Sequence, residues 1–371
     1  MVNDEVKKGL VGVISDETKV SEVMPEINSL TYRGYAVQDL AKNCKFEEVA
    51  YLILNGELPN DNQLKEFESE ERKNRPISQT LKAIIKNYPK SSHPMDTTRT
   101  SVSHMGLEDS DTADNSKEAN MRKAIRLFAQ ISTAVAADFR SRKGQEIIDP
   151  DLNLGFCENF FHMCFGKVPS PEVVKAFDVS MTLYAEHSFN ASTFTSRVIA
   201  SSLSDMHGAV TGAIASLKGP LHGGANEAVA HMLKEVGSPD KAESFILNKI
   251  KNKDLIMGFG HRVYRNGDSR VPTMTEYYYK TAAYYKNTQL PEISKILEST
   301  MLREKNIKPN LDFPAGPTYY LMGFDIDFFT PIFIVSRITG WTAHIMEQFE
   351  NNKLIRPLSK YTGASHREIK K

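Results

Sequence analysis

The segment Gly258–Arg270 combines residue types suited to holding an anionic ligand beside a histidine. Gly258 and Gly260 bracket an aromatic residue, and glycine lets a backbone approach a ligand closely because no Cβ stands in the way. His261 follows and can donate or accept a hydrogen bond near neutral pH. The segment also supplies planar guanidinium groups that suit carboxylate or phosphate oxygens, from Arg262, Arg265 and Arg270. A solvated basic loop is the structural alternative.

His222 lies in Lys218-Gly-Pro-Leu-His-Gly-Gly-Ala-Asn-Glu-Ala228, a pattern that predicts a turn leading into a helix. The positive end of a helix dipole favours the neutral imidazole. A neutral imidazole can donate a hydrogen bond to a developing enolate oxygen, which makes His222 a candidate electrophile. Taken alone, a structural helix-cap histidine is the more frequent explanation of such a pattern.

Asp312 lies between two apolar residues in Pro309-Asn-Leu-Asp-Phe-Pro-Ala-Gly-Pro317. Apolar surroundings raise the pKa of a carboxyl group and improve it as a base. An aspartate beside proline more often forms a local turn. A further polar segment, Ala185–Arg197, contains His187. Three glycine- or proline-flanked polar sites, each with a histidine or a carboxylate, are difficult to explain as packing alone.

Helical periodicity dominates the chain and predicts an all-α fold. Helices are expected over 46–54, 61–73 after a cap at Asn60, 119–142, two stretches within 171–204 around His187, 240–251, 271–285 and 330–350. The polar run 107–117 is expected to be a loop. Strand-like alternation is confined to the first 35 residues, where 10–14 and 30–34 could form a small hairpin.

Two lobes are expected from the length of 371 residues and from two breaks in the helical pattern. One break lies at Gly219-Pro220 and the other at 323–327. A smaller lobe, 221–323, would then be inserted into a larger lobe made of 1–220 and 324–371. Clefts between lobes are favoured ligand sites.

Composition excludes several functional classes. The 46 basic residues balance the 46 acidic ones, so nucleic acid and anionic membranes are not expected as partners. Three cysteines, no long apolar run and no targeting pattern at the start predict a cytoplasmic protein. Phosphate-loop, dinucleotide and Gly-x-Ser-x-Gly motifs are absent, and no histidines or cysteines have metal-ligand spacing. We therefore expect neither a metal nor a cofactor.

These segments, in this order and spacing, resemble the citrate synthase family over nearly the whole chain. That family condenses an acyl-CoA with oxaloacetate through an enolate and then hydrolyses the thioester. The resemblance implies that Asp312 removes the α-proton, that His222 stabilises the enolate and that His261 donates to the oxaloacetate carbonyl. One departure is that the segment ends Asp-Ser-Arg where many members have Asp-Pro-Arg.

The resemblance also implies the binding residues. Oxaloacetate would be bound by His187, Arg270, Arg337 and Arg356. Coenzyme A, a co-substrate and not a cofactor, would be bound by the mobile smaller lobe through Leu255, Ile256, Met257, Gly258, Phe259 and Arg265. Arg356 matches an arginine that reaches the neighbouring subunit's site, which implies a homodimer formed by the larger lobe.

Flanking motifs are most similar to the methylcitrate synthase branch of the family. They are Gly9-Leu-Val-Gly-Val-Ile14, Asn28-Ser-Leu-Thr-Tyr-Arg-Gly-Tyr35, and Asp312-Phe-Pro-Ala-Gly-Pro317 with Leu321-Met-Gly-Phe-Asp325. The branch uses propionyl-CoA, and because one methylene discriminates by only about 1–3 kcal/mol, acetyl-CoA should also be accepted. Alternatives are a citrate synthase of the tricarboxylic acid cycle, a catalytically idle CoA-binding homologue, and a metal-dependent lyase or hydrolase. Retention of His222, His261 and Asp312 argues against the idle homologue.

Overall fold

The computed structural model describes residues 6–261, 264 and 267–369, and this part of the chain is predominantly helical. The all-α prediction is confirmed. Two short 3₁₀ segments, η1 (Lys8–Leu10) and η2 (Ile326–Phe328), accompany the helices. In chain order the α-helices are α1 (Val37–Asn43), α2 (Phe46–Asn55), α3 (Asp61–Asn74), α4 (Gln79–Asn87), α5 (Pro94–Glu108), α6 (Lys117–Arg142), α7 (Phe156–Phe165), α8 (Pro171–Tyr184), α9 (Ala191–Ser201), α10 (Met206–Leu217), α11 (Ala225–Val236), α12 (Pro239–Asn252), α13 (Val271–Tyr284), α14 (Gln289–Lys305), α15 (Asp312–Leu321) and α16 (Phe329–Glu350).

Local signals explain where several helices begin and end. Gly56 ends α2 in the left-handed conformation, with a φ of 98°, which glycine adopts without steric cost. Asn60 caps α3 by accepting hydrogen bonds from the backbone N–H groups of Asn62 and Gln63. The expected loop between 107 and 117 is observed as the connection from α5 to α6. The predicted helices therefore all form, with shifts of a few residues at their ends.

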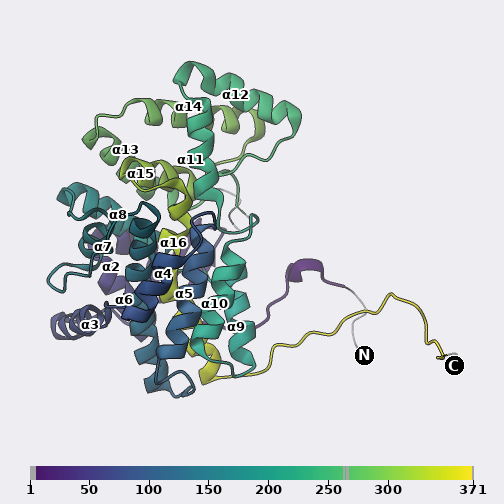
Figure 1. Ribbon diagram of the computed structural model, residues 1–371. Helices are drawn as coiled ribbons and strands as arrows, with labels where there is room; N and C mark the ends of the chain where they lie inside the picture. The colour runs from purple at the N-terminus through teal and green to yellow at the C-terminus, as the bar shows by residue number, and fades with distance from the viewer. Residues whose placement is uncertain (1–5, 262–263, 265–266, 370–371) are drawn as a thin grey trace.

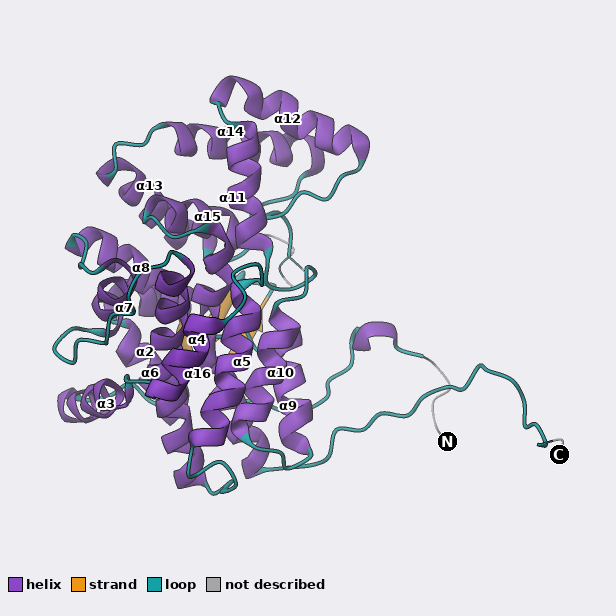
Figure 2. Cartoon of the chain, in the orientation of Figure 1, coloured by secondary structure: helices purple, strands orange, loops and turns teal. Residues whose placement is uncertain are grey.

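The small sheet differs from the predicted hairpin. Its antiparallel strands are β1 (Ser21–Met24), β2 (Ser29–Tyr32) and β3 (Tyr35–Ala36), and Ser21 of β1 pairs with Tyr32 of β2. The prediction of a strand over 10–14 is wrong. Leu10 and Gly12 have φ values of 54° and 73°, which interrupt an extended strand. Figure 2 shows the sheet within the helical body, partly hidden behind helices.

Buried apolar side chains form two clusters. The larger cluster includes residues from β2 and from most of α1 to α10 and α16. The smaller cluster is built from α11, α12 and α14, together with Phe313 of α15. In Figure 1, α11 to α15 form a group above the remaining helices. The smaller cluster lies within this upper group, whereas Ala230, Met274, Ala315 and Tyr319 of the same group belong to the larger cluster.

Helix α16 is the axis of the larger group. It packs against α2, α6, α8, α9 and α10, and most of its residues are buried, Trp341 completely. A helix that is apolar on all sides requires neighbours on all sides, which explains why so many helices gather around it.

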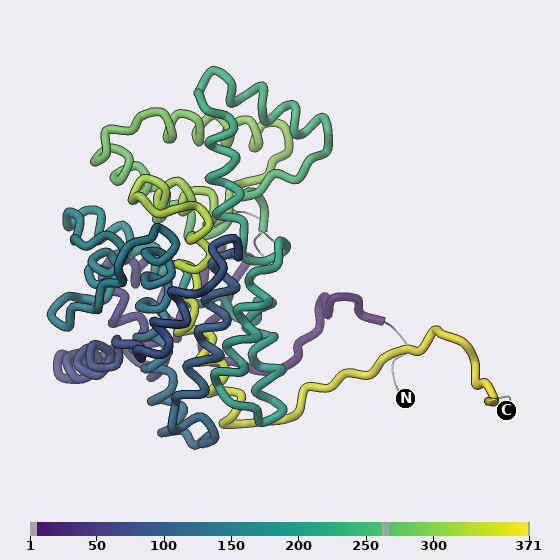
Figure 3. The backbone as a smooth tube through the Cα atoms, in the orientation of Figure 1, coloured from purple at the N-terminus to yellow at the C-terminus, as the bar shows by residue number. Residues whose placement is uncertain are grey.

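Both terminal segments extend away from the helical body on one side (Figure 3). Residues 6–17 and 356–369 are exposed, and they carry apolar side chains such as Ile14, at 91% exposure, and Tyr361, at 77%. Within the described residues, no helix combines the length and the hydropathy needed to cross a membrane.

Candidate active site

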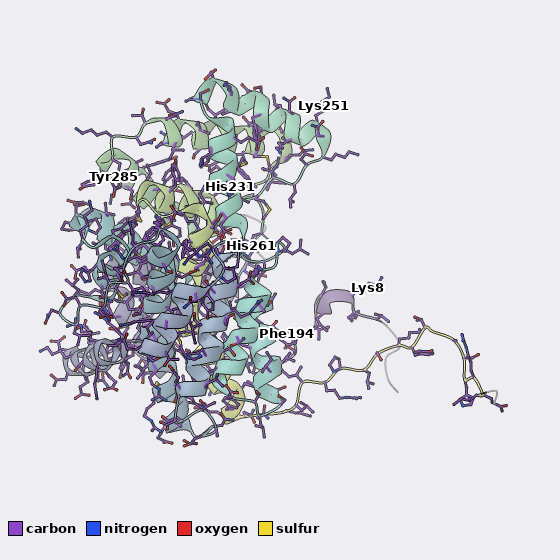
Figure 4. All side chains as sticks on the ribbon, viewed as in Figure 1. Lys8, Phe194, His231, Lys251, His261 and Tyr285 are labelled. Atoms are coloured by element: carbon purple, nitrogen blue, oxygen red, sulfur yellow. The ribbon has the colours of Figure 1, made fainter. Side chains whose placement is uncertain are left out.

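Six of the residues predicted for catalysis or oxaloacetate binding line one cavity of about 1470 Å³. They come from five separate segments and are His187, His222, His261, Arg270, Asp312 and Arg337. Residues 9–16 of the N-terminal segment also contribute to its wall. Figure 4 shows His261 at the junction of the two helix groups. The cavity thus combines residues of both groups.

His222 lies in the turn before α11 and is held by the first turn of α9. The backbone N–H of Ser192 donates to Nε2 of His222 at 3.1 Å, and the Ser192 hydroxyl lies 2.8 Å from the same nitrogen. Because Nε2 accepts a backbone hydrogen bond, the proton of the neutral ring is on Nδ1. Burial and the nearby Arg337 lower the pKa of His222 to about 4, so the ring is a neutral donor at pH 7.

Asp312 is the first residue of α15, and its side chain reaches the cavity. The Tyr184 hydroxyl donates to Oδ1 of Asp312 at 2.6 Å. Burial raises the pKa of Asp312 to about 6, and the hydrogen bond from Tyr184 and the charge of Arg270 oppose this rise. The carboxyl group is therefore ionised at neutral pH and is a stronger base than an exposed aspartate.

His261 is a second neutral imidazole on the cavity wall. The backbone N–H of Tyr264 donates to its Nδ1 at 3.2 Å, so the proton is on Nε2. Burial and Arg270 lower the pKa of His261 to about 4. Its ring centroid lies 5.1 Å from that of His187, whose pKa is also held well below the usual range by burial and by Arg270. Nε2 of His187 is buried and has no hydrogen-bond partner among the described residues.

Two buried arginines provide the positive charge. Arg270 donates from Nε and Nη2 to the two carboxylate oxygens of Asp268, at 2.9 and 2.7 Å. Burial acts to raise the pKa of Asp268, but the charge and hydrogen bonds of Arg270 hold this pKa well below its usual range. Arg337 of α16 donates from Nε to the carbonyl of Tyr184 at 2.7 Å, and its guanidinium lies 4.6 Å from the ring centroid of Phe333. The two cations suit an anionic ligand.

The small sheet supports the loop that carries His187. The Tyr32 hydroxyl lies 3.0 Å from the carbonyl of Glu186, and the Ser21 hydroxyl donates to the Glu186 carboxylate at 2.8 Å. The backbone N–H of Ser188 donates to the Ser21 hydroxyl. Each strand of this first pair therefore anchors one part of the loop between α8 and α9.

The predicted CoA-binding segment lies beside the cavity. Leu255 and Met257 line it, and Phe259 packs on Phe313 with ring centroids 4.6 Å apart. Gly258 has a φ of 84°, and a Cβ there would lie 2.4 Å from a methyl group of Val229, so only glycine fits. Ile256 is half-buried against the smaller cluster.

Two predicted residues, Arg265 and Arg356, need separate mention. Arg265 lies outside the described residues. Arg356 is exposed in the C-terminal segment and is not among the residues that line the cavity. Its predicted role requires a site other than that of its own chain.

The structure adds three residues that sequence reasoning missed. Tyr184 binds Asp312, Asp268 pairs with Arg270, and Ser192 holds His222. Asp268 could have been predicted as the partner of Arg270, because it lies two residues before that arginine and a buried guanidinium needs a carboxylate. Nothing in the sequence signals the other two contacts, which join residues 128 and 30 positions apart.

Among the described residues, His93, Glu227 and Asp327 form a group that could hold a metal ion. Nδ1 of His93 accepts the backbone N–H of Met95, and its Nε2 lies 3.2 Å from the Glu227 carboxylate. Nε2 of His93 can donate to the Glu227 carboxylate in this geometry. None of the three residues lines the cavity.

Comparisons with known proteins agree with this fold. The family model described as citrate synthase, C-terminal domain, matches residues 9–358. A citrate synthase of Mycolicibacterium smegmatis is 54% identical over 364 residues, covering 98% of this chain and 97% of the relative. A 2-methylcitrate synthase of Mycobacterium tuberculosis is 53% identical over 365 residues, covering 98% and 92%.

A solved structure extends the comparison to three dimensions. The ternary complex of carboxymethyl coenzyme A and oxaloacetate with citrate synthase from Thermoplasma acidophilum has a TM-score of 0.94 at 30% identity, and the match covers 99% of this chain and 98% of that one. Fold and relatives together define a condensing enzyme that converts an acyl group to an alkyl group on transfer. The chain belongs to the citrate synthase family.

The raised pKa of Asp312 predicts a pH-dependent gain in stability for Asp312→Asn. The pKa of Asp312 is about 6 in the native state, which is above its value in the unfolded chain. Ionisation of Asp312 therefore destabilises the native state. This effect is complete above pH 6 and absent at a pH below the unfolded pKa. We expect the variant to have a free energy of unfolding about 1–2 kcal/mol above that of the wild type at pH 8, and a smaller gain at pH 4.5. Urea unfolding at both values measures this, and a loss of stability at pH 8 would contradict it.

Proposed function

We propose that this protein is a 2-methylcitrate synthase, which condenses propionyl-CoA with oxaloacetate and water to give 2-methylcitrate and CoA. One observation carries the proposal: a single cavity brings together a carboxylate of raised pKa, two neutral imidazoles and two buried arginines. Proton abstraction beside a thioester needs the base and the enolate donor to act together, and the cavity contains both.

The first step is formation of the enolate. Asp312, as the carboxylate, removes a proton from the carbon next to the thioester carbonyl. As negative charge develops on the carbonyl oxygen, Nδ1–H of His222 donates to it. A neutral donor suits this step because it stabilises the enolate without having to lose its own proton.

The second step is attack on oxaloacetate. Arg270 and Arg337 bind its carboxylates, and the unpartnered Nε2 of buried His187 adds a further polar contact. The enolate carbon forms a bond to the keto carbon, and Nε2–H of His261 donates to the oxygen as it becomes an alkoxide. Water then hydrolyses the citryl-type thioester and releases CoA.

The choice of propionyl-CoA rests on the flanking motifs and on relatives named 2-methylcitrate synthase, which include the Mycobacterium tuberculosis protein and two Corynebacterium glutamicum proteins at 50% and 51% identity. Phe333, Tyr184 and Leu311 add apolar surface to the cavity, which suits an additional methyl group. Citrate synthase is the second candidate, because the Mycolicibacterium smegmatis relative at 54% identity has that name.

We propose that residues 221–323 form a smaller, CoA-binding lobe that closes on a larger lobe of residues 1–220 and 324–371. A separate cluster of buried apolar residues supports this division. The cavity draws residues from both parts, so closure would exclude water from the reacting atoms. The backbone of Leu255–Phe259 would then contact the CoA.

We also propose a homodimer in which Arg356 reaches the partner's cavity. The exposed apolar side chains of both terminal segments, including Ile14 and Tyr361, support a partner surface that covers them. The extended backbone beyond Ile355 gives Arg356 the reach that such a contact needs.

Thiol release tests the proposed reaction. The kcat/KM values for acetyl-, propionyl- and butyryl-CoA should be measured with saturating oxaloacetate. We expect propionyl-CoA to be preferred, with acetyl-CoA within about 10- to 200-fold. A preference for acetyl-CoA would establish the second candidate, and no release from any thioester would refute the enzyme assignment and favour an idle CoA-binding homologue.

The acid limb of the rate profile should report Asp312. We expect kcat/KM to fall as pH drops through about 6, since only the carboxylate acts as a base. Tyr184→Phe removes a hydrogen bond that lowers this pKa, so the limb should move up by about one pH unit. Tyr278→Phe is a matched control, because its hydroxyl contacts Ser294 away from the cavity. An unmoved limb in Tyr184→Phe would contradict the assignment.

Mixed dimers test the role of Arg356. Arg356→Ala and Asp312→Asn chains should each have little activity at low oxaloacetate concentration. If Arg356 acts in the partner's site, a dimer of one chain of each kind has one complete site. Unfolding and refolding equal amounts together should therefore restore about a quarter of wild-type activity, since half of the dimers are mixed. Arg356 acting in its own chain would give no restoration.

A further inference from the structure

Ser192, the residue that holds His222, is itself contacted by the only tryptophan of the chain. Nε1 of Trp341 donates to the Ser192 hydroxyl oxygen at 3.1 Å. Neither Ser192 nor Trp341 has any exposed surface. Water therefore cannot replace this contact, and a lost hydrogen bond here would leave a buried polar group unsatisfied.

The hydroxyl of Ser192 has three polar neighbours. These are Nε2 of His222 at 2.8 Å, Oδ1 of Asn190 at 2.7 Å and Nε1 of Trp341 at 3.1 Å. A hydroxyl has one proton and two lone pairs, and an indole N–H can only donate. Trp341 therefore occupies one lone pair and restricts the hydroxyl proton to the directions of His222 and Asn190.

The position of Trp341 is coupled to that of Arg337. The two residues are four positions apart on α16 and so share one face of that helix. Between them, a Cβ on Gly340 would lie 2.6 Å from the carbonyl oxygen of Ala185, so the glycine lets α16 lie directly against the loop that leads to α9. One helix face thus presents Arg337 to the cavity and Trp341 to Ser192.

We infer that Trp341 is a positioning residue for His222: its indole N–H holds Ser192, whose backbone N–H donates to Nε2 of His222, and it so keeps the ring in place with its proton on Nδ1. This inference rests on the proposed function, in which Nδ1–H stabilises the enolate. Trp341 does not touch the substrate in this arrangement and acts only through Ser192.

Because Trp341 is the only tryptophan, an indole isostere can replace it uniformly during biosynthesis. In β-(3-benzothienyl)alanine a sulfur atom takes the place of the N–H while the size of the ring is retained. We expect kcat to fall about tenfold, with the KM for oxaloacetate within about twofold of the wild-type value. Ser192→Ala should give a similar fall, and the combination should give no further loss.

Tyr278→Phe, which removes a buried hydroxyl beside Ser294, is the matched control and should retain wild-type kcat. A wild-type kcat in the protein with the Trp341 isostere would overturn the inference. So would losses of kcat that multiply when the isostere is combined with Ser192→Ala. Thermal unfolding of each variant separates a loss of positioning from a loss of fold.

A measurement independent of turnover separates this inference from the proposed function. In protein labelled with ¹⁵N-histidine, the signals of His222 are identified by their absence in His222→Gln. We expect a protonated Nδ1 and an unprotonated Nε2 in the wild type, and averaging of the two signals in the isostere. If the ¹⁵N signals of His222 are unchanged in the isostere, the role of Trp341 is refuted even if the enzyme is active. If the wild type releases no thiol, only the proposed function is refuted.

Discussion

The ion pair between Arg270 and Asp268 connects the segments on which the site depends. A guanidinium can be buried only with a partner, and Asp268 supplies both carboxylate oxygens to it. The same carboxylate accepts the backbone N–H of Leu311, the residue before Asp312, and Arg270 also donates to the carbonyl of Leu183, the residue before Tyr184. One buried pair therefore sets the relative positions of three segments, and with them the contact between Tyr184 and Asp312.

Burial has opposite effects on the two kinds of titratable group in this cavity. It disfavours the charged form of each, so it raises the pKa of Asp312 to about 6 and lowers those of His222 and His261 to about 4. From about pH 6 up to neutral pH the carboxyl group is mostly ionised, and both imidazoles are neutral. A base and two hydrogen-bond donors thus coexist without proton transfer between them, and the arginines remain positively charged over the same pH range.

Most of the fold could be predicted because its signals are local. The helix caps at Asn60 and Gly56 and the apolar period of α16 depend only on neighbouring residues. The N-terminal strands were harder to place, because a strand is stabilised by a partner elsewhere in the chain. Residues 10–14 alternate like a strand, yet Leu10 and Gly12 have left-handed backbone conformations, and the pairing forms further on, between Ser21–Met24 and Ser29–Tyr32.

The sequence by itself determined the candidate residues: His222, His261, Arg270 and Asp312 occur in glycine- and proline-rich segments whose composition predicts ligand contact. These four line one cavity together with His187 and Arg337. Only the tertiary structure decided their chemical states. The proton of His222 is on Nδ1 because the first turn of α9 donates to Nε2, and the carboxyl group of Asp312 is tuned by the hydroxyl of Tyr184, 128 residues away. A pKa and a tautomer depend on what surrounds a side chain in space, and those surroundings come from distant segments that only folding brings together.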